Sequence, residues 1–220
     1  MIARAVLVAR RELLAERRHP DGLAAALAFT GMLILLESLA FGPVRARDAG
    51  VASGAYWIAV LFAAVLVASR SFDRELEDDA IDALIAIPGG RDALYAGKLL
   101  ALAFVIAIVA VAGGVVALVL LSLDVALPAH LLLITFLGIV ALPPVVAIVS
   151  FLSLRVRARV ALVPILAFPM LVPQLLAATE GSSAALSGDG ATALGWAGIL
   201  AAFALVYTVL GLTTVPAAIE

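Results

Sequence analysis

The sequence predicts an all-α integral membrane protein with six transmembrane helices. Of its 220 residues, 65% are hydrophobic and only 14% are charged, whereas soluble domains average about 45–50% apolar and about 25% charged residues. The apolar residues form continuous runs, which favours helices over the alternating strands of a membrane barrel. Because about 20 such residues cross the hydrocarbon core as a helix, we expect a single transmembrane domain over residues 1–220, without a soluble domain.

Polar breaks separate six predicted spans, which lie at about residues 23–41, 53–69, 99–123, 130–154, 160–178 and 193–215. Gly42 and Pro43 close the first span, and the second is near the lower length limit for crossing a bilayer. A cleaved signal peptide is the competing interpretation of residues 1–41. It is disfavoured because the polar front is about 22 residues long and because removing the first span would break the charge pattern of the remainder.

Basic residues indicate how the spans are oriented. Residues 1–22, residues 70–98 and the break after the fourth span hold all but two of the 14 lysines and arginines, the exceptions being Arg45 and Arg47. In a six-span arrangement these three segments lie on one side, which the positive-inside rule assigns to the cytoplasm. We therefore expect a multi-pass membrane protein with both termini in the cytoplasm.

Residues 1–22 are expected to form a helix in the membrane interface, followed by an elbow. An i, i+4 stripe indicates the helix: Ile2, Val6, Ala9, Leu13 and Arg17. Several other arginines would then lie near anionic lipid headgroups, which makes membrane lipid a predicted partner. A simple positively charged anchor with no further role is the alternative.

The segment 70–98 carries seven of the 16 acidic residues. A helical stripe of apolar residues runs through it and ends at Pro88, Gly89 and Gly90; its members are Phe72, Leu76, Ala80, Leu84 and Ile87. The acidic residues occupy the rest of that helix surface, and a second short turn is expected over residues 91–98. The pattern predicts a cytoplasmic helical hairpin between the second and third spans.

This acidic hairpin is a candidate docking element for a soluble partner. A connector needs only a few residues, and an acidic surface would be repelled by the negative inner leaflet, whereas a basic, partly apolar groove on a partner would attract it. The predicted docking residues are Arg70, Phe72, Glu75, Leu76, Asp78, Asp79, Asp82 and Leu84. The alternative is a solvated connector that only separates two spans.

Prolines and one carboxylate interrupt the apolar spans. Pro143 and Pro144 in the fourth span, with Pro169 and Pro173 in the fifth, remove backbone donors and predict a mobile or re-entrant wall. Static kinks that fit the packing are the alternative. Glu37 is the acid placed well inside a span, where it is expected either to face the bundle interior or to reach outward to the interface.

Several chemistries are excluded by the sequence. Cysteine is absent, so thiolate metal sites and cysteine nucleophiles are excluded. The Gly97-Lys98 pair is no phosphate loop, because position 92 is Asp and position 99 is Leu. No catalytic or metal-binding motif is present, and the net charge of −2 gives no sign of nucleic-acid binding. We expect a non-catalytic subunit without catalytic or metal-ligating residues; His19 and His130 fall on opposite membrane sides and cannot share one heme.

The run RSFDRELEDDAIDALIAIPGGRDALYAGK at 70–98, with FPMLVPQL at 168–175 and six spans in a chain of this length, resembles the heme exporter protein B (CcmB) family. The family's pattern falls on residues throughout these two segments: Arg70, Phe72, Glu75, Asp78, Pro88, Tyr95, Lys98, Pro169 and Pro173. The sequence departs from it at Asp79, where the family usually has Gly. This change makes the segment more acidic.

The resemblance implies a type 2 ABC exporter-like permease with an interfacial N-terminal helix, a cytoplasmic coupling helix over 70–98 and a partly re-entrant region near spans five and six. It implies an ATPase partner, CcmA, which would bind ATP, together with CcmC and CcmD. It also implies a role in cytochrome c maturation, in which ATP hydrolysis releases the heme-loaded periplasmic chaperone CcmE. Heme is then a handled ligand rather than a cofactor of this subunit. A permease for drugs, lipids or polysaccharides, and a secondary transporter, are the alternatives.

Overall fold

The computed structural model describes residues 2–77, 90–153 and 159–218, and these fold into seven helices. Six of the helices are long and apolar enough to cross a membrane, which confirms the predicted number of spans. The helices are α1 (Ile2–Arg18), α2 (Asp21–Arg45), α3 (Ala49–Glu77), α5 (Gly90–Leu121), α6 (Pro128–Ser153), α7 (Arg159–Ser187) and α8 (Gly190–Ala218).

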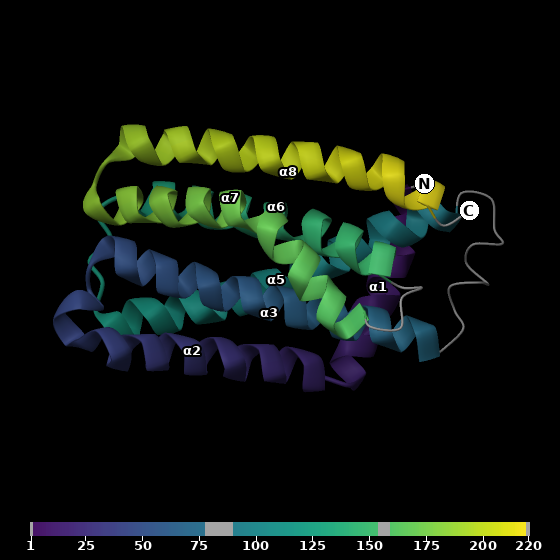
Figure 1. The fold of residues 1–220 in the computed structure, drawn as a ribbon, viewed down its shortest axis with the longest axis horizontal. Helices are drawn as coiled ribbons and strands as arrows, with labels where there is room; N and C mark the ends of the chain where they lie inside the picture. The colour runs from purple at the N-terminus through teal and green to yellow at the C-terminus, as the bar shows by residue number, and fades with distance from the viewer. Residues whose placement is uncertain (1, 78–89, 154–158, 219–220) are drawn as a thin grey trace.

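The six long helices lie roughly side by side, and α1 lies across one end of them (Figure 1). The described ends of the chain lie at this end, together with the end of α3 and the start of α5; we call it the terminal end. The connections α2–α3, α5–α6 and α7–α8 lie at the opposite end, the far end. The two termini therefore share one side of the bundle, as the charge pattern predicts.

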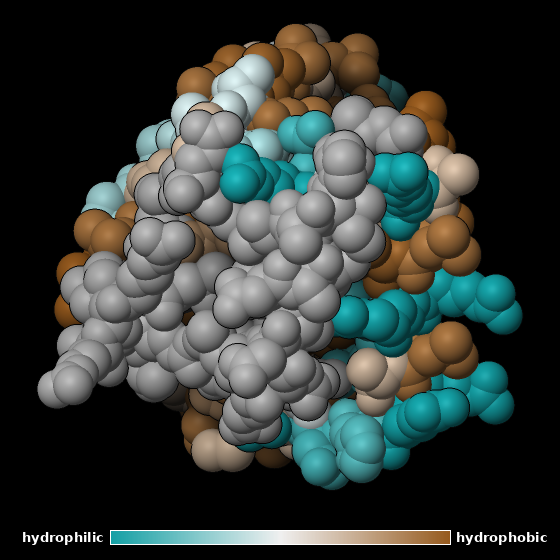
Figure 2. All heavy atoms as spheres, turned by 90° about the vertical axis from the view of Figure 1, so that its right-hand side faces the viewer, coloured by the Kyte–Doolittle hydropathy of each residue, from teal (hydrophilic) through white to brown (hydrophobic). Residues whose placement is uncertain are grey.

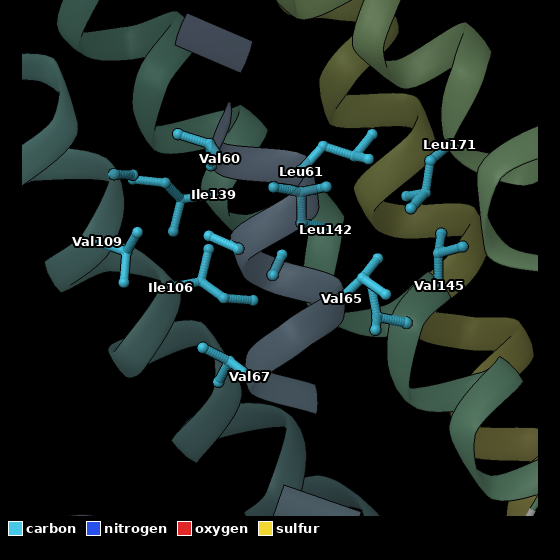
Figure 3. Close-up of a cluster of buried hydrophobic side chains, with 14 of the residues drawn as sticks. Val60, Leu61, Val65, Val67, Ile106, Val109, Ile139, Leu142, Val145 and Leu171 are labelled. Atoms are coloured by element: carbon cyan, nitrogen blue, oxygen red, sulfur yellow. The ribbon is translucent and has the colours of Figure 1, made fainter. Parts of the chain in front are cut away.

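The core forms around α3 and α6, which pack between the outer helices. Figure 3 shows branched aliphatic side chains from α3, α5, α6 and α7 in mutual contact, among them Val65, Ile106, Leu142 and Leu171. Many buried positions of α3 are alanine, which lets neighbouring backbones approach closely in a membrane bundle. A buried hydrogen bond from Trp57 Nε1 to Ser182 Oγ, 2.9 Å long, joins α3 to α7.

The far end contains three tight connections. The first span closes at Gly42 as predicted, since its backbone leaves helical geometry there (φ 72°, ψ 165°). Asp189 caps α8 by accepting hydrogen bonds from the amide and hydroxyl of Thr192, at 3.1 and 2.6 Å. The side-chain hydrogen bond from Thr192, followed by the backbone bonds, lowers the pKa of the Asp189 carboxyl below its ordinary value.

The fifth span is longer than predicted, because α7 continues past residue 178 to Ser187. Residues 179–187 are mostly small or polar, so the sequence predicts a break between two spans here. They stay helical because Gly181 and Ser182 are buried against the neighbouring helices. A Cβ at Gly181 would lie 2.7 Å from Ile134 of α6 and 3.1 Å from Trp196 of α8. Tertiary packing thus overrides weak local propensity here.

Candidate coupling site

The predicted docking segment begins on α3. Arg70 is exposed near the end of this helix, and the backbone of Phe72, Glu75 and Leu76 continues it to Glu77. The first part of the docking segment is therefore an extension of a membrane-spanning helix. The other predicted docking residues, Asp78, Asp79, Asp82 and Leu84, lie outside the described residues.

The predicted short turn over residues 91–98 is wrong. Helix α5 begins at Gly90 and runs without a break to Leu121, so these residues form its first turns. The apolar residues among them pack into the bundle, and Leu94 and Tyr95 are fully buried. The docking segment thus begins on one long helix, α3, and is followed by another, α5.

Lys98 links α5 to both α1 and α3 at the terminal end. Its side chain is 0% exposed, and its Nζ donates a 3.0 Å hydrogen bond to the carbonyl oxygen of Ser71. The same Nζ lies 3.6 Å from Oε2 of Glu12, whose side chain is 12% exposed. The Ser71 hydroxyl donates a 3.3 Å hydrogen bond to that carboxylate oxygen. We call these three residues the polar latch.

The polar latch satisfies a charge that would otherwise be costly to bury. An ammonium group removed from water is tolerated only when a counter-charge and hydrogen bonds replace its hydration. Here Glu12 supplies the charge and Ser71 supplies the carbonyl acceptor. Ser71 lies within the predicted docking segment, so the latch connects the start of that segment to α1 and α5.

The approach of α1 to α5 depends on Gly97, the residue before Lys98. A Cβ at position 97 would lie 2.6 Å from the carbonyl oxygen of Ala5 and 2.6 Å from Cβ of Val8. Such distances are closer than van der Waals contact allows, so only glycine fits. Gly97 lets the two backbones meet, and Lys98 then reaches the next turn of α1.

Tyr95 fixes the opposite side of α5 to α6 and α8. Its ring lies 5.6 Å from that of Phe151 in α6, and a Cβ at Gly211 of α8 would overlap its hydroxyl. The first turns of α5 are therefore held by Lys98 against α1 and α3, and by Tyr95 against α6 and α8. These two side chains therefore connect the start of α5 to four other helices.

Glu12 was not predicted as a functional residue. Ala5, Val8 and Ala9 are the buried residues of α1, whereas Ile2 is 80% exposed and Val6 is half exposed. The buried face follows the contact with α5 rather than the apolar stripe. Glu12 lies on the buried face together with Ala5 and Val8. Tyr95 and Lys98 were identified only through the family pattern.

The predicted proline wall consists of continuous helices in the structure. Pro143 and Pro144 lie buried inside α6, and Pro169 and Pro173 are exposed on α7. Figure 1 shows that α7 changes direction in its first half, which holds these last two prolines. The prolines therefore bend α7 without dividing it. Whether this wall moves stays a prediction.

Glu37 lies partly buried on α2, and its Oε2 is buried without a hydrogen-bond partner among the described residues. The two histidines lie apart, as predicted. His19 is at the turn between α1 and α2, and His130 is in the first turn of α6 at the far end. Within the described part of the chain, no group of three His, Asp or Glu side chains is placed to hold a metal ion.

Near the far end, a cavity of about 210 Å³ lies between α3, α5 and α6. Ser53, Tyr56 and Ser182 supply polar groups to a mainly apolar lining. The Ser53 hydroxyl has no hydrogen-bond partner among the described residues. This volume is below the range of about 300–1,000 Å³ that is usual for small-molecule sites, so the cavity does not provide a large ligand site.

Together, six apolar spans, a helix laid across the terminal end and the polar latch define a multi-pass helical membrane protein of the permease type. The profile of the CcmB protein family matches residues 3–220. The chain therefore belongs to the CcmB family. It is 30% identical over 172 residues to heme exporter protein B of Rhodobacter capsulatus, a match that covers 77% of this chain and 78% of that protein.

A second relative is heme exporter protein B of Escherichia coli K12. It is 32% identical over 92 residues, which is 42% of each chain. The family resemblance predicted from the sequence is thus confirmed by a match over nearly the whole length.

Proposed function

We propose that this chain is the membrane subunit of an ABC transporter complex that serves cytochrome c maturation and handles heme as its substrate. The observation that carries the proposal is the family match over residues 3–220, together with a relative named heme exporter protein B. The subunit itself is non-catalytic. ATP is bound and hydrolysed by a partner, because the chain has no phosphate loop of its own.

The partner ATPase, CcmA, docks on the acidic segment that starts at Arg70 and extends through Leu84. When that partner changes shape, the segment pulls on the end of α3 and on the start of α5. The polar latch supports this proposal, because Ser71 and Lys98 lie at these two helix ends and Glu12 joins them to α1. Tyr95 passes the movement on to α6 and α8.

The remaining partners are the membrane subunits CcmC and CcmD and the periplasmic chaperone CcmE, whose heme-loaded form the complex releases. In this arrangement the terminal end faces the cytoplasm of a bacterium and the far end faces the periplasm. The excess of Lys and Arg in the segments that meet at the terminal end supports this orientation.

A second candidate is the permease of another type 2 ABC exporter, with a drug, a lipid or a polysaccharide as its substrate. The six spans, the N-terminal helix and the docking segment suit that function equally well. Only the family match favours heme and cytochrome c.

Affinity purification of the tagged full chain from mild detergent, followed by identification of its co-purifying subunits, separates the two candidates. An ATPase with cytochrome c maturation proteins is the expected result. A complex that holds only copies of this chain and an ATPase, without those proteins, would favour the other exporter class.

A further inference from the structure

A groove of about 770 Å³ lies along the junction of α1, α2 and α5 at the terminal end. Residues from all three helices line it, among them Arg10, Arg17, Leu23, Leu100, Phe104 and Ile108. Its volume falls within the range of about 300–1,000 Å³ that binds small ligands. We call it the α1–α5 groove. It is separate from the polar latch, which lies on the buried side of α1.

One wall of the groove is an apolar stripe on a membrane-spanning helix. Leu100, Phe104 and Ile108 follow one another at i, i+4 spacing on α5 and are 51%, 55% and 37% exposed. These three residues extend about 12 Å along the helix axis. Since α5 is a candidate span, the stripe faces hydrocarbon and fits an acyl chain.

The rim of the groove is positively charged. Arg10 and Arg17 are exposed on α1 and have no ion pair or hydrogen bond with another part of the chain that the structure describes. Glu16 also lines the groove, but its Oε1 accepts a 2.9 Å hydrogen bond from the amide of Leu23 and caps α2. The groove thus carries a net positive rim above an apolar floor. Figure 2 shows hydrophilic and hydrophobic residues side by side at this end of the molecule.

We propose that the α1–α5 groove binds one anionic phospholipid. Its phosphate lies between Arg10 and Arg17, and one acyl chain lies along Leu100, Phe104 and Ile108. Charge complementarity selects this occupant, because guanidinium groups bind phosphate oxygens with paired hydrogen bonds. A soluble partner would leave the apolar stripe in hydrocarbon, and a zwitterionic lipid would gain less from the two arginines. The bound lipid would hold α1 in place whatever the transporter carries.

The test places a tryptophan in the groove with Phe104→Trp in the full-length chain, reconstituted into phosphatidylcholine vesicles. Brominated phosphatidylglycerol or brominated phosphatidylcholine is then added, because brominated chains quench an indole that they touch. The signal of the chain without Phe104→Trp is subtracted, since Trp57 and Trp196 also fluoresce. We expect phosphatidylglycerol to reach half-quenching at a mole fraction at least ~5-fold lower, given the attraction that one arginine contributes at a membrane surface.

Two pairs of variants then test whether Arg10 and Arg17 cause the preference for phosphatidylglycerol. Arg10→Gln with Arg17→Gln should bring the two lipids to equal quenching, whereas Arg45→Gln with Arg47→Gln, an equal charge change at the far end, should keep the preference. Should the glutamine pair not fold, Arg10→Lys with Arg17→Lys retains the charge, and its preference should fall in ~1 M salt, where screening acts within about 3 Å.

Three results would overturn the proposal. Equal quenching by both lipids in the Phe104→Trp protein that keeps Arg10 and Arg17 means that the groove binds lipid without selecting its charge. Absence of quenching by either lipid means that a protein segment covers the groove. A preference for phosphatidylglycerol that survives the loss of both rim arginines means that other residues select the charge of the lipid. A preference that is insensitive to salt in the lysine pair has the same meaning.

Discussion

Replacing Lys98 with methionine removes the central charge of the polar latch while keeping a side chain of similar length. The variant loses the hydrogen bond to the Ser71 carbonyl and leaves Glu12 facing an apolar side chain. Breaking one side of a buried ion pair costs about 3–5 kcal/mol. Because Glu12 keeps 12% exposure, we expect the lower end, a loss of about 3 kcal/mol in the free energy of unfolding.

A second substitution identifies the cause of this loss. Glu12→Leu combined with Lys98→Met replaces the ion pair with apolar groups, which is often neutral or stabilising. The double variant should therefore recover most of the loss, which corresponds to a coupling free energy of at least about 2 kcal/mol between the two positions. Arg11→Met is the matched control, since it removes a 47% exposed cation that also pairs with Glu12, at 3.3 Å. That exposed pair should contribute less than about 1 kcal/mol to the free energy of unfolding.

The assay is unfolding of the full chain in mixed micelles with increasing SDS, followed by the fluorescence of Trp57, which is 2% exposed and hydrogen-bonded in the core. A loss in Lys98→Met no larger than that in Arg11→Met would refute the reasoning. Additive losses in the double variant would also refute it, because the two side chains would then act independently.

Three further predictions concern packing, mobility and pH. Gly97→Ala should push α1 away from α5 and lower the SDS concentration needed for half-unfolding. Gly198→Ala is the control: a Cβ added there meets open space, so this variant should be neutral or slightly stabilising. Equal effects of the two substitutions would contradict the close approach of α1 to α5. Pro169→Ala with Pro173→Ala should leave ATP hydrolysis intact but reduce cytochrome c production if α7 moves, and normal maturation would count against it. Because the pKa of Asp189 is lowered in the folded chain, its cap stabilises fully above the ordinary pKa of an aspartate, and this stabilisation is lost as pH falls through the lowered pKa. Asp189→Asn should therefore make the protection factor of the amides at the start of α8, which is the intrinsic exchange rate divided by the observed rate, independent of acid; an unchanged acid response of that factor would oppose this.

The number of spans and the shared side of the two termini could be predicted because both follow from composition. Apolar runs set the number of helices, and the distribution of Arg and Lys placed both termini on one side. Gly42 marked the end of its span because its backbone conformation interrupts helices. Each of these properties depends on residues close together in the sequence.

The site could be predicted only in part, because its contacts join distant residues. Glu12 and Lys98 meet only after α1 has folded back across α5, and the periodicity of α1 does not mark the face that carries Glu12. Gly97 and Lys98 resembled part of a phosphate loop, yet in the structure they are a packing position and a buried cation. Gly181 looked like a loop residue because its partner Ile134 lies on another helix.

We propose above that the acidic segment, which starts on the last turns of α3, binds an ATPase. The most direct test measures the amount of ATPase that co-purifies with the full chain carrying Glu75→Lys and Asp78→Lys. Asp124→Lys with Glu180→Lys is the control, since both acids are exposed near the far end and the charge change is equal. The account predicts loss of the ATPase from the first variant, with the chain still inserted in the membrane, and full retention by the control. Full retention of the ATPase by Glu75→Lys with Asp78→Lys would contradict it.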